Sequence, residues 1–145
     1  MCIVDQNIYP ILTVVLQAAE ECFNPIEEEG GIIIEKEKVY EFVKIKNVYE
    51  GTSSAPSLYE TDREKLSELI FSKICKGWKM YASFHTHPSF SATPSDLDLT
   101  KLFQSFKYNI IYSVKNDMFS YSEWLGEKIY SVYLPKKTIQ ILINK

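Results

Sequence analysis

The sequence predicts an α/β (α+β) fold, in which helices flank one mixed β-sheet. Segments with apolar residues at helical spacing are interspersed with short runs of β-branched and aromatic residues, which is typical of helices packed on a sheet. The chain has 145 residues, of which 46% are hydrophobic and 24% are charged, and these values suit one globular domain. We therefore expect residues 1–145 to form a single domain.

The first predicted helix covers residues 8–22. Pro10 is acceptable in its first turn because the nitrogen there needs no helical partner. Asn24-Pro25 ends the helix. Its apolar stripe consists of Ile11, Leu12, Val15, Leu16 and Ala19.

A hairpin is expected next. The apolar run Gly31–Glu35 and the alternating run Val39–Lys46 read as two strands, and Lys36-Glu37-Lys38 lies between them as the turn. Residues 51–57 are rich in Gly, Ser, Thr and Pro and indicate a loop.

A second helix is predicted over residues 61–76. Thr61 can serve as its N-cap with Glu64 at the third helical position, which together form a capping box, and Gly77 ends it. The rest of the chain reads as a strand at 78–87, a helix from Ser95 to Phe106, and strands at 108–114, 119–124 and 128–134. Residues 138–143 fit either a final strand or a short helix.

Charge and cysteine content restrict the compartment and the partners. The net charge is −3, although the first 35 residues contain seven acidic residues and no lysine or arginine; this gives no electrostatic case for nucleic acid. Cys2, Cys22 and Cys75 form no paired pattern, which favours a reduced, cytoplasmic location. The apolar run 11–19 is too short to span a membrane, so no membrane association is expected.

The only two histidines of the chain, His85 and His87, are two residues apart in a predicted strand. Alternate side chains of a strand share a face, so both can reach one metal ion, and Asp98 can add a carboxylate from the next element. Two imidazoles and one carboxylate, with a fourth position open to water, are typical of catalytic zinc. We therefore expect one zinc ion per chain. Read alone, Ser95 and Asp98 also fit an ordinary helix N-terminus.

The motif His85-Thr86-His87-Pro88, followed by Ser95-Asp96-Leu97-Asp98 and preceded by Glu28-Glu29-Gly30-Gly31, closely resembles that of the JAMM (MPN+) zinc metallopeptidases. The resemblance covers most of the chain and implies an MPN/JAB-type fold, broadly similar to cytidine deaminases. It implies a compact, prokaryotic-type, deubiquitinase-like isopeptidase, because segment 48–60 is short where many deubiquitinating members carry an insertion.

The same resemblance implies the roles of single residues. His85, His87 and Asp98 would bind zinc, Glu28 would be the general base and acid for a zinc-activated water, and Ser95 would hydrogen-bond the developing oxyanion. Glu29 is the alternative base. Only one of the two can face the zinc in a strand, and the spacing to Gly31 favours Glu28.

The implied activity is cleavage of a ubiquitin-like protein from its conjugates, or processing of its precursor. Two other classes stay open: a metal-dependent hydrolase of small amides, and a non-catalytic MPN-type binding or scaffold protein. A zinc deaminase is disfavoured because its cysteine signature is absent.

Overall fold

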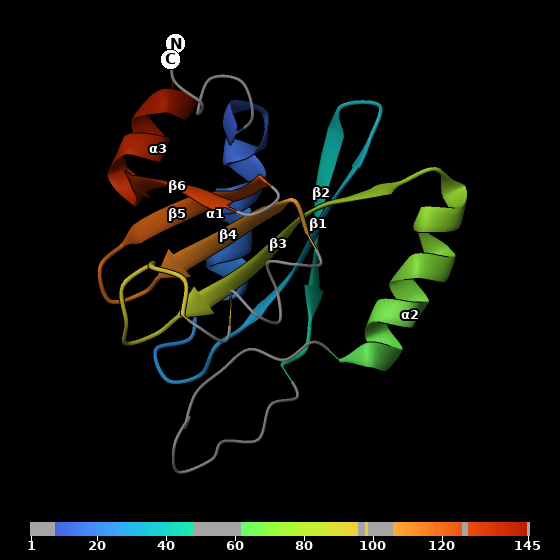
Figure 1. Ribbon diagram of the computed structural model, residues 1–145, viewed down its shortest axis with the longest axis horizontal. Helices are drawn as coiled ribbons and strands as arrows, with labels where there is room; N and C mark the ends of the chain where they lie inside the picture. Colours follow the sequence, from blue (N-terminus) through green and yellow to red (C-terminus); the bar gives the residue numbers. More distant parts are fainter. Residues whose placement is uncertain (1–7, 48–61, 96–97, 99–105, 126–127, 145) are drawn as a thin grey trace.

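A computed structural model of the chain describes residues 8–47, 62–95, 98, 106–125 and 128–144. A six-stranded sheet with the strand order β2-β1-β3-β4-β5-β6 is the centre of the fold (Figure 1). Its strands are β1 (Gly30–Lys36), β2 (Val39–Ile45), β3 (Lys79–His87), β4 (Tyr108–Ser113), β5 (Met118–Leu125) and β6 (Lys128–Pro135). β3 and β4 run parallel and the other neighbours antiparallel, which confirms the predicted mixed sheet.

Three α-helices accompany the strands in the described part of the chain: α1 (Leu12–Glu21), α2 (Arg63–Ser72) and α3 (Lys136–Ile143). A 3₁₀ turn containing Pro10 leads into α1, and another, Ile74–Lys76, follows α2. None of the helices in these ranges is long and apolar enough to cross a membrane.

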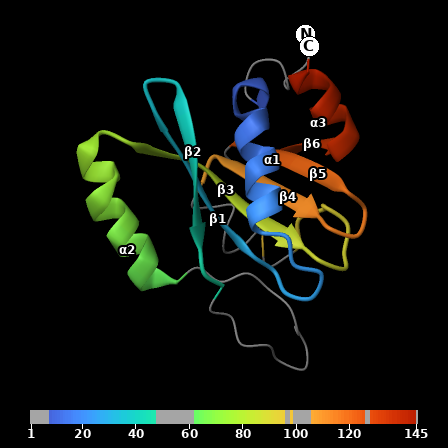
Figure 2. The ribbon, with the colours of Figure 1, turned by 180° about the vertical axis from the view of Figure 1, so that it is seen from behind.

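α1 and α2 lie on opposite faces of the sheet, as the two views show (Figure 1 and Figure 2). The alternation of side chains along β1 explains this, because Ile33 packs in the cluster of α1 and α3, whereas Ile32 and Ile34 pack with Leu69 of α2. Both faces are therefore apolar along this central strand, and the short run of isoleucines is the sequence sign of that burial.

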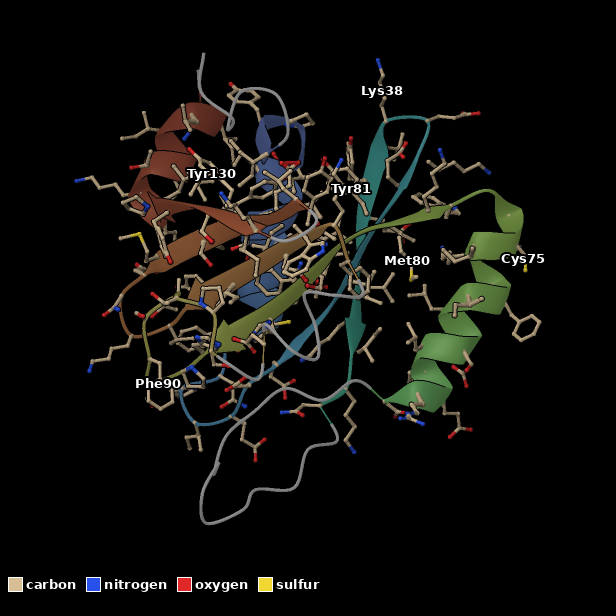
Figure 3. All side chains as sticks on the ribbon, viewed as in Figure 1. Lys38, Cys75, Met80, Tyr81, Phe90 and Tyr130 are labelled. Atoms are coloured by element: carbon tan, nitrogen blue, oxygen red, sulfur yellow. The ribbon has the colours of Figure 1, made fainter. Side chains whose placement is uncertain are left out.

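The hairpin of β1 and β2 turns at Glu37 and Lys38, as expected. Both residues have positive φ, 51° and 67°, which matches the right-handed twist of the flanking strands. The backbone N–H of Lys38 also donates to Oε2 of Glu35 at 2.9 Å. This tip marks one end of the molecule, and Phe90, beside the last residues of β3, lies near the other (Figure 3).

Two local predictions need correction or refinement. The N-cap of α2 is Asp62, not Thr61: the Asp62 carboxylate accepts from the backbone N–H groups of Glu64 and Lys65. Asp is a better N-cap than Thr, so the helix begins one residue later than predicted. Residues 138–143 belong to a helix, α3, whose Ile139 is buried in the core.

Other predictions lie partly outside the described residues. The helix predicted from Ser95 to Phe106 includes residues 96–97 and 99–105, and the loop predicted at 51–57 also falls beyond the described ranges. These two assignments stay predictions.

Candidate metal centre

Two strands bring the candidate residues to the same end of the sheet. β1 begins at Gly30, which pairs with His85 near the end of β3. Because these strands are antiparallel, the segment just before β1 lies beside the last residues of β3. Glu28, His85 and His87 form a buried group whose potential ligand atoms all lie within 4.8 Å of one another.

His85 and His87 face the same point, as the strand spacing predicted. Their Nε2 atoms are 3.2 Å apart. Both side chains are buried, at 1% and 4% exposure. Two imidazole nitrogens this close and this well shielded from water can serve as a preformed pair of ligands.

Asp98 completes the arrangement. Its Oδ1 lies 3.1 Å from Nε2 of His85, and its Oδ2 lies 3.1 Å from Nε2 of His87. Donor atoms around a tetrahedral zinc ion at about 2.0–2.1 Å are separated by roughly 3.3 Å. The measured separations are close to that value, so the donor set fits a zinc ion. The ligand roles themselves stay predictions.

His87 is oriented by a contact on its other nitrogen. Its Nδ1 lies 2.8 Å from the carbonyl oxygen of Ser91. A carbonyl can only accept, so Nδ1 carries the proton, and in the neutral ring Nε2 keeps its lone pair for a metal. The turn after β3 thus selects the tautomer that can bind.

The contacts between His87, His85 and Asp98 shift the pKa values of His87 and Asp98 in opposite directions. Burial alone would lower the pKa of His87, but its contacts with Asp98 and with the Ser91 carbonyl, and the charge of Glu28, raise that pKa above its ordinary value. Burial alone would raise the pKa of Asp98, whereas the charge of His85 and the hydrogen bonds it accepts hold that pKa well below the usual range. Asp98 is therefore ionised at neutral pH, as a metal ligand must be.

Glu28 and Glu29 point to different surroundings. Glu28 is 4% exposed and lies in the group with the two histidines. The carboxylate of Glu29 instead pairs with Lys44, at 3.3 Å. Both residues precede β1, which begins at Gly30, and of the two candidates only Glu28 lies in the described metal-binding group.

Gly30 allows β1 to approach β3 closely beside this group. A Cβ atom at Gly30 would lie 2.3 Å from the carbonyl oxygen of Phe84 and 2.9 Å from Cβ of His85. Both distances are below van der Waals contact, and the first involves backbone that cannot move aside cheaply. The glycine after the acidic run is therefore required by the strand spacing next to His85.

Ser95 and Asp98 form a reciprocal pair. The backbone N–H of Ser95 donates to Oδ2 of Asp98 at 2.8 Å, and the backbone N–H of Asp98 donates to Oγ of Ser95 at 3.1 Å. The helix-start interpretation and the ligand interpretation are thus compatible, because this local pairing holds the Asp98 carboxylate against the histidines. The Ser95 side chain accepts in this pair, so its own hydroxyl proton can still be donated.

Two positioning residues were not anticipated from the sequence. Thr86 bonds the Glu29 backbone: its N–H donates to the Glu29 carbonyl at 2.8 Å, and its Oγ1 accepts from the Glu29 N–H at 3.0 Å. Nδ2 of Asn47 donates to the Glu28 carbonyl at 2.7 Å. In the sequence, the position of Thr86 between the two histidines was the one indication that it could hold backbone near the site. Asn47 had none, because its contact depends on the pairing of β2 with β1.

The chain is similar to a known protein family and to solved structures. Residues 11–125 match the family described as prokaryotic homologs of the JAB domain. The fold resembles that of protein DSY2949 from Desulfitobacterium hafniense, with a TM-score of 0.59 and 18% identity, covering 88% of this chain and 86% of that one. A JAB1/MPN domain protein from Archaeoglobus fulgidus matches with a TM-score of 0.49 and 23% identity, over 88% and 94% of the two chains. No curated protein matches by sequence.

Proposed function

The chain belongs to the JAB/MPN family, as a prokaryotic homolog of the JAB domain, and from this we propose that it is a zinc-dependent isopeptidase or peptidase. The family and the Glu28, His85 and His87 group fit a metal-dependent hydrolase. The observation that carries the proposal is the convergence of a buried carboxylate with three potential metal ligands at one end of the sheet.

The residues divide into ligands and proton carriers. His85, His87 and Asp98 would hold the metal through Nε2, Nε2 and the carboxylate. When bound, a zinc ion supplies Lewis acidity that polarises an amide carbonyl and lowers the pKa of a water molecule to about 7.

Glu28 and Ser95 would act on the substrate. The Glu28 carboxylate takes a proton from the attacking water and returns it to the nitrogen of the leaving amine. Oγ of Ser95 donates a hydrogen bond to the carbonyl oxygen as that oxygen gains negative charge. Asn47 and Thr86 both hold the peptide bond that joins Glu28 to Glu29.

The proposed substrate is a ubiquitin-like protein, cleaved from its conjugates or processed from its precursor in the cytoplasm. A slender Gly-Gly tail would suit a narrow cleft at the metal because it has no side chains to exclude. Cys22 and Cys75 are unpaired thiols, which supports a reducing compartment. Burial raises the pKa of Cys22 to about 12, so that thiol is a core residue and no nucleophile.

The proposal is tested by metal content and by substrate choice. Purified protein should hold one zinc ion per chain, and the double variant His85→Ala/His87→Ala should hold none while keeping a native circular dichroism spectrum. Stoichiometric zinc in the folded double variant would refute the assignment.

Zinc-loaded protein should cleave a fusion of an intact ubiquitin-like protein, and a chelator should abolish cleavage. A short peptide with the same scissile bond should be a poor substrate, because most of the binding surface is missing. Equal kcat/KM for the two would indicate a small-amide hydrolase instead. Zinc binding without hydrolysis of either would indicate a binding or scaffold role.

A further inference from the structure

A basic hollow is lined in part by Glu29, the residue that follows the candidate base in the chain. Three lysines and one glutamate line a cavity of about 360 Å³, referred to below as the lysine hollow: Glu29, Lys44, Lys46 and Lys65. The lining carries three positive charges and one negative charge, on a chain whose net charge is −3. The net charge of the lining is therefore positive, whereas that of the whole chain is negative, and the lining attracts anionic groups.

The lysine hollow is adjacent in the chain to Glu28. Glu29 lines it directly, and consecutive Cα atoms are about 3.8 Å apart. On the other side, Lys46 precedes Asn47, whose Nδ2 binds the Glu28 carbonyl. The same short pieces of backbone thus hold the candidate base and line the hollow.

The lysines differ in how fully their charges are balanced. Lys44 pairs with Glu29 at 3.3 Å and donates to the Glu21 carbonyl at 3.2 Å. Lys65 pairs with Glu68 at 3.4 Å. Lys46 forms no ion pair with any residue that the structure describes. An incoming anion would find at least this charge uncommitted.

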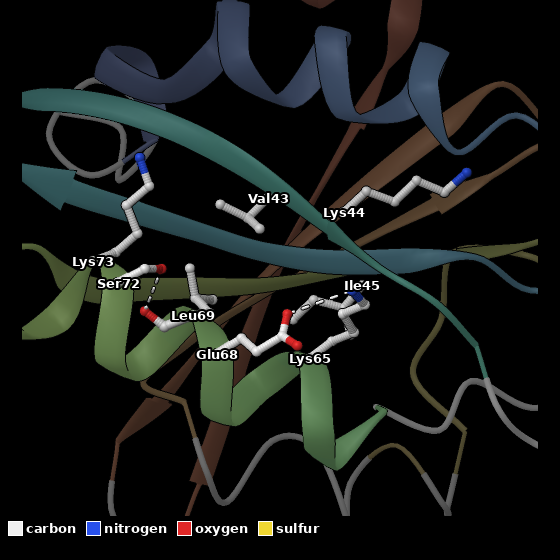
Figure 4. A pocket seen from close by; sticks show the side chains of 8 residues that line it. All are labelled: Val43, Lys44, Ile45, Lys65, Glu68, Leu69, Ser72 and Lys73. Carbon is white, nitrogen blue, oxygen red and sulfur yellow. Dashed lines mark hydrogen bonds and ion pairs between the residues drawn. The ribbon is translucent and has the colours of Figure 1, made fainter.

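Lysines on an edge strand are common because they discourage pairing between sheets, and β2 is such an edge in the described sheet. That explanation does not cover Lys65, which comes from α2. An adjoining hollow of about 180 Å³ between β2 and α2 shows the two elements together, with Lys44 on the strand and Lys65 on the helix (Figure 4). Elements separated in sequence thus contribute lysines to the lining of one hollow, and among these lysines Lys46 has no ion-pair partner in the described part of the chain.

We propose that the lysine hollow is a substrate subsite that binds an acidic side chain close to the scissile amide. The inference rests on the proposed function, since it places this subsite beside its reacting centre. The substrate class that follows is a peptide or protein conjugate with Asp or Glu within a few residues of the cleaved bond.

The test is a binding measurement that does not depend on turnover. Two fluorescent hexapeptides with amidated C-termini are titrated into zinc-loaded protein, one with three glutamates alternating with glycine and one with glutamines in their place. The acidic peptide should bind several-fold more tightly at low salt, and the difference should shrink towards 0.5 M salt, where exposed charges are screened within about 5 Å.

Lys46→Glu should weaken binding of the acidic peptide on the order of tenfold, because an attraction becomes a repulsion. It should leave the neutral peptide unaffected. Lys38→Gln is the matched control, because it removes one exposed lysine from the far tip of the same hairpin (Figure 3) and should change neither affinity. Thermal melts show whether each variant is folded.

The outcomes separate this inference from the proposed function. Equal binding of the two peptides, or equal effects of Lys46→Glu and Lys38→Gln, would overturn the subsite even if the protein hydrolyses a ubiquitin-like fusion. The neutral peptide is also titrated in a form with a free C-terminus, and tighter binding of this form than of the amidated acidic peptide would overturn the side-chain assignment. Charge-dependent binding lost in Lys46→Glu supports the subsite even if no hydrolysis is found.

Discussion

At the scale of single residues, three consecutive glutamates lie in three different surroundings. Glu27 is exposed, Glu28 is buried against the histidines, and Glu29 pairs with Lys44. Neighbours of the same chemical type can thus have unrelated roles, because their side chains contact different parts of the fold.

We predict that Glu28→Gln lowers kcat by at least about a hundredfold, because the general base is lost. The zinc content should stay at one per chain. The amide has the shape of the carboxylate but cannot carry the proton. The measurement pairs kcat on the fusion substrate with metal analysis of the same sample.

Glu27→Gln is the matched control in the same acidic run and should keep full activity. Glu29→Gln should keep its kcat as well, whatever its effect on substrate affinity. Loss of kcat in Glu29→Gln together with full activity in Glu28→Gln would show that the base is assigned to the wrong neighbour.

At the scale of an element, the start of α2 depends on one cap. The Asp62 carboxylate accepts from the backbone N–H of Glu64 at 3.0 Å and from that of Lys65 at 3.4 Å. Lys65 is also the residue by which α2 contributes to the lysine hollow. The cap therefore stabilises the helical turn that carries Lys65.

We predict that Asp62→Ala lowers the free energy of unfolding by about 1 kcal/mol, the usual effect of removing a side-chain cap. Asp62→Asn keeps an acceptor oxygen and should lose only a few tenths of that. Urea denaturation of the three proteins measures the difference. A stability of Asp62→Ala equal to that of the original protein would mean that the cap contributes nothing.

At the scale of the whole molecule, the buried site links stability to pH and to metal. The ordinary pKa of Asp98 is 3.8, and this pKa is lowered in the folded protein. The stability contributed by the ionised carboxylate is therefore fully present above pH 3.8 and is lost as the pH falls through the lowered pKa. The ordinary pKa of His87 is 6.5 and is raised, so the stability contributed by its protonated form is present below 6.5 and is lost as the pH rises through the folded pKa. The metal-free protein should gain most from this pair at mildly acidic pH.

Stabilisation by zinc should increase with pH, because zinc must displace the proton from Nε2 of His87 in order to bind. We predict that a fixed excess of zinc raises the melting temperature by more at pH 8 than at pH 5.5. Metal-free protein should show no such increase in melting temperature from pH 5.5 to pH 8. Differential scanning fluorimetry at both pH values, with and without zinc, measures it. A zinc-induced shift independent of pH would show that no protonated histidine is displaced.

Local patterns were enough for most of the element order and for the choice of candidate residues. The spacing of His85 and His87 predicted that both rings face one point, because a strand repeats every two residues whatever surrounds it. The β-branched run before Glu35 predicted a strand because β-branched side chains pack well on a sheet. The family resemblance added the upstream glutamate, and strand parity then allowed only one of Glu28 and Glu29 to face the histidines.

Tertiary structure alone decided what depends on contacts between distant segments. The last segment is a helix and no strand because Ile139 packs into the core beside α1. Asp98 meets both histidines, and Asn47 meets Glu28, only after the chain has folded. The lysine hollow joins β2 with α2, whose residues lie about twenty positions apart in the printed sequence. Periodicity determines which way a side chain points from its own backbone, whereas packing between elements determines what it then meets.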